Sequence, residues 1–158
     1  MFTTDKKNSG TMMRKIDLIV IHCSATRADR SLTPDDLEMQ HRQRGFNGTG
    51  YHYYIRKDGT VHLTRPIERI GAHVKGFNSN SVGICYEGGL DAHGCPADTR
   101  TPEQRAALRL LVHQLFETFP GSRVCGHRDL SPDRNGNGEI EPEEWIKACP
   151  CFEVKAEF

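Results

Sequence analysis

Two histidines and one cysteine of this chain are of residue types that could together hold a zinc ion. His22 follows the apolar run 18–21, His127 follows the short segment 123–126, and Cys149 lies near the C-terminus. Two imidazoles and one thiolate can occupy three corners of a tetrahedral zinc site and leave the fourth for water, as in catalytic zinc centres. The three residues are far apart in the sequence, so spacing alone does not establish the site. For each imidazole, an ordinary core or surface histidine is the alternative.

Segment 133–144 carries a second pattern of metal ligands, which is typical of a calcium-binding loop. It fits D-x-[DN]-x-[DN]-G-x5-E throughout. Such loops bind calcium through side chains and one backbone carbonyl, here Asp133, Asn135, Asn137, the Glu139 carbonyl and Glu144. Asn replaces Asp at two of these positions, so we expect modest affinity. No helical signal precedes the segment, and a solvated Asn/Gly turn is the alternative.

The elements that must position these residues form an alternation of strands and helices. Strands are predicted over residues 16–21, 51–55, 60–63, 81–86 and 123–125. Thr33-Pro34 and Thr101-Pro102 each place an N-cap before a proline, so helices should begin there. The first helix should end near Arg44, and the second carries an apolar stripe to Phe119 that we assign to the core. The alternation predicts an α/β fold with a mixed sheet, and residues 90–100 are expected to form a loop.

Length and charge indicate one domain without an obvious nucleic-acid or membrane partner. The chain has 158 residues, with 21 Lys and Arg against 21 Asp and Glu. Nucleic-acid binders and polybasic membrane anchors carry a basic excess that is absent here. No apolar run approaches the roughly 18 residues that span a bilayer. We expect residues 1–14 to be a flexible extension without a secretion signal, and residues 15–158 to be the domain.

The chain contains six cysteines, which without a secretion signal suggest free thiols in a reducing compartment. Cys85 and Cys125 lie in apolar strand patterns, where cysteine is usually a small buried hydrophobe. Cys151 lies two residues after Cys149. For Cys151 three roles stay open: a spectator, a competing metal ligand or a disulfide partner.

Seven short motifs follow one another in an order that resembles a known family. They are IHCSAT (21–26), GYHY (50–53), KDGTV (57–61), GAHVKGFN (71–78), NSVGIC (80–85), GH (126–127) and KACP (147–150). Their order resembles the type-2 N-acetylmuramoyl-L-alanine amidases, close to the amidase-type lysozymes of bacteriophages and related to the peptidoglycan recognition proteins. The resemblance covers residues 16–152 and implies a single α/β domain, with a central mixed sheet flanked by helices and zinc in a surface groove.

The resemblance also implies roles for individual residues. The zinc ligands would be His22, His127 and Cys149, and the catalytic side chains Tyr51 and Lys147. His73 and Asn80 match positions in or beside the substrate groove. The expected reaction is hydrolysis of the amide bond between the lactyl group of N-acetylmuramic acid and the L-alanine of the stem peptide in peptidoglycan. Whether Tyr51 stabilises the oxyanion or holds the attacking water stays open.

Two other functions are alternatives to the enzyme. Recognition proteins that only bind peptidoglycan typically lack the cysteine ligand, so Cys149 together with Lys147 favours catalysis. Some phage relatives also regulate an RNA polymerase, but no separate motif for that role is present. We expect a monomer that is made in the cytoplasm and acts on the bacterial wall after release.

Overall fold

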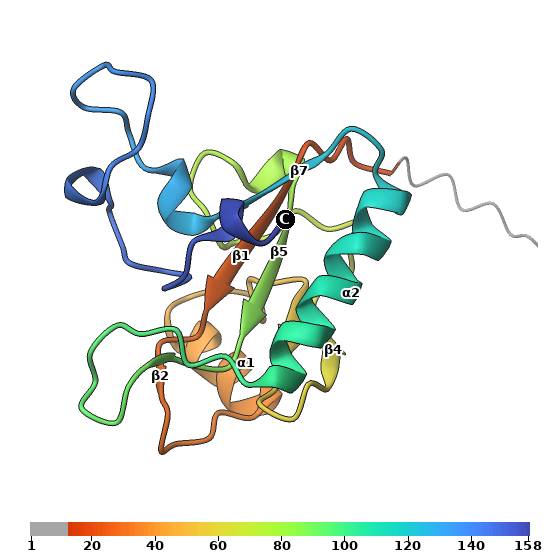
Figure 1. Ribbon diagram of the computed structural model, residues 1–158. Coiled ribbons are helices and arrows are strands. Elements are labelled where there is room, and N and C mark those ends of the chain that lie inside the picture. Colours follow the sequence, from red (N-terminus) through yellow and green to blue (C-terminus); the bar gives the residue numbers. More distant parts are fainter. Residues whose placement is uncertain (1–12) are drawn as a thin grey trace, which may run out of the picture.

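The computed structural model describes residues 13–158, and within this range a five-stranded mixed sheet forms the centre of the molecule (Figure 1). The strand order is β4-β3-β5-β1-β7. The strands are β1 (Leu18–Cys23), β3 (Tyr53–Ile55), β4 (Val61–Leu63), β5 (Ser81–Tyr86) and β7 (Arg123–Gly126). Only the β3–β4 pair is antiparallel. The predicted α/β class and mixed sheet are therefore confirmed.

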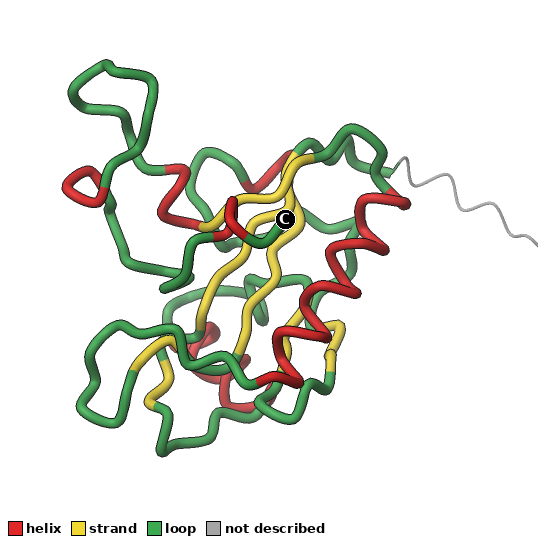
Figure 2. The backbone as a smooth tube through the Cα atoms, in the orientation of Figure 1, coloured by secondary structure: helices red, strands yellow, loops and turns green. Residues whose placement is uncertain are grey.

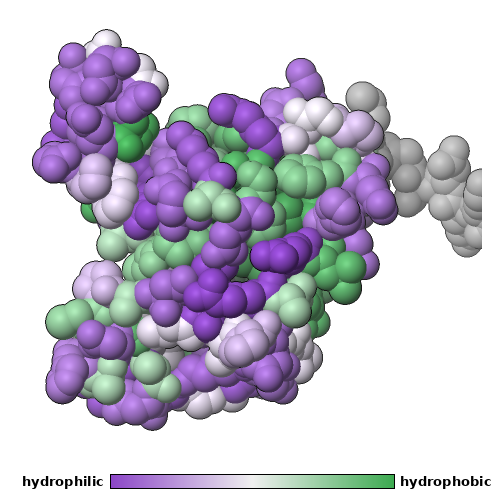
Figure 3. Space-filling view, in the orientation of Figure 1, coloured by the Kyte–Doolittle hydropathy of each residue, from purple (hydrophilic) through white to green (hydrophobic). Residues whose placement is uncertain are grey.

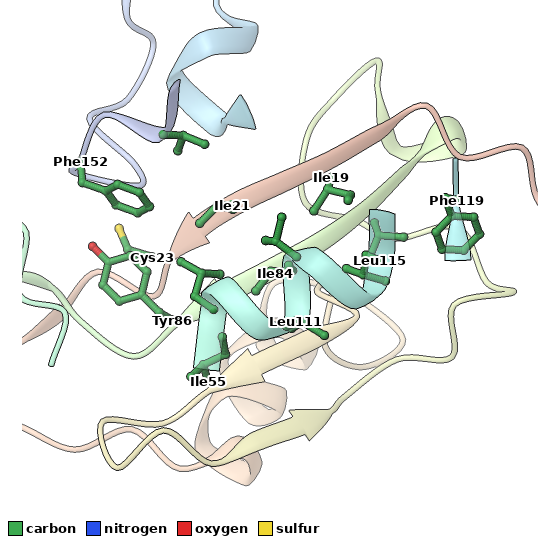
Figure 4. Packing of buried hydrophobic residues seen from close by; sticks show 14 of the residues in the cluster. Ile19, Ile21, Cys23, Ile55, Ile84, Tyr86, Leu111, Leu115, Phe119 and Phe152 are labelled. Carbon is green, nitrogen blue, oxygen red and sulfur yellow. The ribbon is translucent and has the colours of Figure 1, made fainter. Parts of the chain in front are cut away.

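Strand β1 is buried on both faces, as its apolar sequence predicts. Ile19, Ile21 and Cys23 belong to the main hydrophobic cluster, which also contains the apolar stripe of α2 (Figure 4). Leu18 and Val20 pack in a second cluster with Val74 and Cys125. Because successive strand residues point to opposite faces, His22 lies on the face away from α2.

Both helices begin where the Thr-Pro pairs predict. Helix α1 spans Pro34–Gln43 and α2 spans Pro102–Thr118, and each begins with a capping box. The Thr33 hydroxyl accepts a hydrogen bond from the Asp36 amide, and the Thr101 hydroxyl accepts one from the Gln104 amide. Both caps satisfy amides that have no partner inside the helix.

Several element boundaries differ from the predicted ones. β1 continues past Ile21 to Cys23, because His22 and Cys23 pair in register with Cys85 and Tyr86 of β5. β3 begins at Tyr53 and not at residue 51. A short strand, β6 (Gly89–Leu90), ends on the first residue of the segment predicted as loop. It pairs with β2 (Thr26–Arg27) in a separate two-stranded sheet.

Much of the remaining chain is irregular (Figure 2). Within residues 13–158 there are four 3-10 turns: Asn78–Asn80, His127–Leu130, Pro142–Glu144 and Val154–Ala156. The segment with the calcium-loop pattern projects from the body and presents a largely hydrophilic surface (Figures 1 and 3).

The predicted N-terminal extension lies outside the described residues except for its last two. Of these, Arg14 is fastened to the domain, since its guanidinium donates to the carbonyls of Ile67 and Ser81. In the described range, no helix has the length and apolar character needed to cross a membrane.

Candidate metal centre and groove

His22, His127 and Cys149 come together at one edge of the sheet. Their ligand atoms all lie within 4.8 Å of one another. The Nδ1 atom of His22 is 3.8 Å from the Cys149 sulfur, and the ring centroids of His22 and His127 are 4.8 Å apart. The three residues that the sequence analysis assigns to zinc thus form one cluster.

The parallel pairing of β1 with β7 brings the two histidines together. Ile21 is opposite Gly126 in the register, so the residue that follows each of them is a histidine at the same edge. Carboxyl ends of parallel strands meet at one edge of a sheet, which is where α/β proteins commonly build sites. His22 is almost fully buried and belongs to the strand itself, whereas His127 opens the 3-10 turn after β7.

Cys149 belongs to the irregular C-terminal segment, and hydrogen bonds from backbone amides hold it beside these histidines. The Arg128 amide donates to the Cys149 carbonyl at 2.9 Å. The Cys23 amide donates to the Cys149 sulfur at 3.3 Å. A donor of this kind stabilises negative charge on sulfur, which suits a thiolate ligand.

The protonation of the two histidines suits a metal. Burial, followed by the nearby charges of His73, His127 and Lys147, holds the pKa of His22 well below its ordinary value. Burial and then Lys147 also lower the pKa of His127. Both imidazoles are therefore neutral at neutral pH, as metal ligation requires. Two neutral imidazoles and one thiol in a cluster of this size fit zinc.

His73 contacts the His22 ring and orients it through a hydrogen bond. The Nε2 atom of His22 is 2.8 Å from Nδ1 of His73, whose own Nε2 is 3.1 Å from the Ser81 hydroxyl. Burial lowers the pKa of His73 to about 3, so its ring is neutral and its Nδ1 can accept the Nε2–H of His22. For Nδ1 of His22, which lies 3.8 Å from the Cys149 sulfur, to bind a metal, the proton of His22 must be on Nε2, where it can be donated to His73. Metal-ligating histidines are commonly oriented by such a second hydrogen bond.

A groove opens over the cluster and contains both predicted catalytic side chains. It encloses about 310 Å³, and its lining includes Tyr51, Lys147, His127 and Cys149. The Tyr51 and His22 ring centroids are 5.0 Å apart. Burial raises the pKa of Tyr51 well above its usual value, so its hydroxyl stays protonated and can donate a hydrogen bond.

The groove continues into a second hollow of about 530 Å³, which shares Arg44, His73, His127 and Lys147 with the first. Lys75 adds a further cationic side chain to this part. The described lining of both parts contains no Asp or Glu. The groove therefore favours an anionic ligand.

Of the two residues that the resemblance assigns to the substrate groove, only one is in the described groove lining. His73 lines the groove, as expected. Asn80 is absent from the described lining, and its amide lies 3.5 Å from the Asp17 carboxylate. Asn78 occupies the groove instead, and its side-chain oxygen accepts the amides of His73 and Val74. Asn78 belongs to the motif at 71–78 and is not among the residues predicted from the sequence.

In the segment with the calcium pattern, the side-chain oxygens accept hydrogen bonds from amides of the same loop. Asp133 accepts from Gly136 and Gly138, and Glu144 accepts from Arg134, Asn135 and Glu141. The carboxylate of Glu144 is buried, whereas Asp133 is exposed. Asn135, Asn137 and Glu139 are likewise exposed. Both ends of the segment are thus tied together through Glu144.

Comparisons with known proteins show the family and the fold of this chain. A family model described as N-acetylmuramoyl-L-alanine amidase matches residues 12–143. An endolysin of Enterobacteria phage K11 is 37% identical over 145 residues, 92% of this chain and 87% of that protein. The solved N-acetylmuramoyl-L-alanine amidase LysC from Clostridium intestinale URNW is similar with a TM-score of 0.67 and 29% identity, over 87% of this chain and 77% of that one. Drosophila PGRP-LB shares the fold, with a TM-score of 0.65 and 21% identity over 87% of this chain and 75% of that one. By this match, and in agreement with its ordered motifs, the chain belongs to the type-2 N-acetylmuramoyl-L-alanine amidase family.

Proposed function

We propose that this amidase cleaves the bond between the lactyl group of N-acetylmuramic acid and the L-alanine of the stem peptide in peptidoglycan, and that it requires zinc. The observation that carries the proposal is the His22–His127–Cys149 cluster, with donor atoms within 4.8 Å of one another and two of its members in the groove wall. The cations of the groove suit the carboxylates of a stem peptide.

His22, His127 and Cys149 would hold the zinc, which when bound would supply Lewis-acid activation of water and of the scissile carbonyl. Lys147 stabilises the negative charge that develops on the carbonyl oxygen as the amide is attacked. The protonated Tyr51 hydroxyl donates either to that oxygen or to the attacking water. Because the described groove lining contains no carboxylate, no Asp or Glu there serves as a general base.

The test is a digest of purified sacculi, read by mass spectrometry. Wild-type protein should release stem peptides with a free N-terminal L-alanine, lose this activity with phenanthroline and regain it with added zinc. Cys149→Ser should lose both bound zinc and product, whereas Cys95→Ser, at an exposed cysteine outside the groove lining, should retain both. Binding of sacculi without release of peptides would instead show a recognition module. Release of peptides by metal-free protein would refute the zinc requirement.

We further propose that segment 133–144 binds calcium through Asp133, Asn135, Asn137, the Glu139 carbonyl and Glu144. The support is the unbroken sequence pattern, which ends two residues before Ile146 and three before Lys147. Calcium would order the segment that leads into Lys147 and Cys149, and so would be structural. Modest affinity is expected because the site has few carboxylates.

Calorimetric titration of the zinc-loaded protein with calcium tests this second proposal. Wild-type protein should give binding heat and a higher Tm at millimolar calcium, and Asp133→Asn should weaken both. Asp91→Asn is the control, because Asp91 is a partly exposed carboxylate whose oxygen also accepts loop amides. Equal responses of the two variants, or no heat with wild type, would show that the segment is only a turn.

For its cellular setting, we propose that the protein is made in the cytoplasm, reaches the wall after release and acts as a monomer. The relative from phage K11 is called an endolysin, which supports action on a wall from within. Light scattering of the purified protein tests the monomer.

A further inference from the structure

Two further thiols, those of Cys23 and Cys151, lie beside the proposed zinc ligand Cys149, and the proposed reaction uses neither of them. The sulfurs of Cys23 and Cys151 are 3.9 Å apart, and both residues line the groove with Cys149. All six cysteines of the chain are free thiols. Cys23 is the last residue of β1, next to His22, and Cys151 follows Cys149 by two residues.

The backbone around Cys151 directs its side chain toward β1. Cys151 has a φ of 68°, in the left-handed region that residues other than glycine seldom adopt. Neighbouring bonds hold it there, because its amide donates to the Ala148 carbonyl at 2.8 Å and the Tyr86 hydroxyl donates to the Pro150 carbonyl at 2.6 Å. Phe152, the next residue, is buried in the same core cluster as Cys23 (Figure 4).

Gly89, in the groove lining, leaves space for the sulfurs of Cys23 and Cys151 because it has no side chain. A Cβ atom at Gly89 would lie 2.5 Å from the Cys23 sulfur and 3.8 Å from the Cys151 sulfur. A side chain at position 89 would therefore collide with Cys23, whereas its distance to the Cys151 sulfur would be an ordinary contact. Cys23 is 8% exposed, whereas Cys151 is half-buried, so a reagent entering the groove meets Cys151 first.

We propose that Cys23 and Cys151 form a disulfide when the protein meets an oxidised small-molecule disulfide such as glutathione disulfide. The Cys151 thiolate attacks one glutathione sulfur, the glutathione S–S bond breaks and one glutathione thiolate leaves. The Cys23 thiolate then attacks the Cys151 sulfur of the mixed disulfide, and the second glutathione leaves. The two protein thiols are oxidised, their two protons pass to the departing thiolates, and one glutathione disulfide becomes two glutathiones.

This disulfide would cross-link β1, which carries His22, to the C-terminal segment, which carries Cys149. It joins the neighbour of His22 to the segment of Cys149, while leaving the Cys149 thiol free. A cross-link between residues so far apart in the chain restricts the unfolded state strongly, so it should raise stability. The cross-link would form in an oxidising compartment and open in a reducing one.

Peptide mapping of the zinc-loaded protein after treatment with glutathione disulfide tests the proposal. The non-reduced digest should contain one linked peptide pair with Cys23 and Cys151, lighter by two hydrogens than the separate peptides. The Tm should rise by roughly 5–15 °C and return to its starting value with dithiothreitol. This readout does not depend on amidase activity, so it stays informative if the proposed reaction is wrong.

Two single variants complete the design. Cys151→Ser should keep the Tm of the reduced wild type and lose both the linked pair and the Tm rise. Cys95→Ser, which removes an exposed cysteine away from this site, should retain both. Glutathione retained on Cys151, alkylation of Cys23 and Cys151 at full yield after oxidation, or a Cys23–Cys149 link with loss of zinc would each overturn the proposal.

Discussion

At the scale of single residues, Lys147 and Tyr51 bring a positive charge and a hydrogen-bond donor, respectively, to the surroundings of His22. Lys147 contributes positive charge around His22 and His127, since it lowers the pKa of both. Tyr51 lies against the His22 ring and keeps its proton. The first can stabilise an oxyanion by charge and the second by a hydrogen bond.

Removing either group should therefore reduce turnover without removing zinc. We expect Lys147→Ala and Tyr51→Phe each to lower kcat on sacculi by about 10²–10³-fold, as loss of one oxyanion donor typically does. Metal analysis should still find zinc in both variants. Lys155→Ala, at an exposed lysine outside the groove lining, is the control and should match wild type. Loss of zinc from Lys147→Ala would mean that this lysine organises the ligands instead.

His73 should act as a positioning residue for His22. His73→Ala removes the hydrogen-bond partner of His22 Nε2, so the His22 ring can tilt or change tautomer. We expect metal affinity to fall about 10–100-fold, measured by competition with a chromogenic chelator. His73→Asn offers an acceptor oxygen and should recover part of the loss. Equal affinities of the alanine variant and wild type would limit His73 to contact with substrate.

At the scale of elements, the two helix caps differ in their surroundings. The Thr33 cap is exposed. The Thr101 hydroxyl accepts from Gln104 and also donates to the Lys57 carbonyl at 2.6 Å. Gln104 is fully buried and donates to the carbonyls of Ile55 and Glu87, so this cap joins α2 to the sheet.

Loss of the α2 cap should therefore cost more than loss of the α1 cap. We expect Thr33→Ala to lower the free energy of unfolding by about 1 kcal/mol. Thr101→Ala should lower it by about 2–3 kcal/mol, because it also leaves a partly buried carbonyl without its donor. Urea denaturation of both variants measures the difference. Equal losses would show that the bond to Lys57 adds nothing.

At the scale of the whole molecule, buried neutral histidines should make the fold sensitive to acid. His52 is fully buried, its Nδ1 accepts the Gly83 amide and its Nε2 donates to the Arg69 carbonyl. Burial lowers the pKa of His52 from 6.5 to about 4. Between these values the unfolded chain binds the proton and the folded one does not. The stabilisation of the fold that comes from keeping His52 neutral is therefore fully present above pH 6.5, and it declines as the pH falls toward 4.

For metal-free protein, we expect the free energy of unfolding to fall by on the order of 3 kcal/mol between pH 6.5 and 4 because of this one residue. His52→Gln should be less stable at neutral pH but should show a flatter dependence between pH 6.5 and 4. His113→Gln, at an exposed histidine, should keep the wild-type slope. Denaturant unfolding at several pH values with chelator present measures both slopes. An unchanged slope in His52→Gln would assign the acid sensitivity to other groups.

The sequence by itself determined the local structure and the identity of the proposed metal ligands. The apolar run at 16–21 and the Thr-Pro pairs before α1 and α2 act through contiguous residues, so their outcome needs no knowledge of the fold. His22, His127 and Cys149 could be selected because their motifs occur in a family order. From spacing alone, each histidine would have stayed an ordinary one.

Only the tertiary structure decided which side chains surround those ligands. The order β4-β3-β5-β1-β7 sets residues that are distant in the chain side by side. This order and the packing of the irregular segments place His73 against His22 and Cys151 against Cys23. Such contacts depend on strand pairing and on how an irregular segment packs, and neither leaves a periodic signal in the sequence. The local pattern therefore predicts the elements and names the ligands, while long-range pairing selects their neighbours.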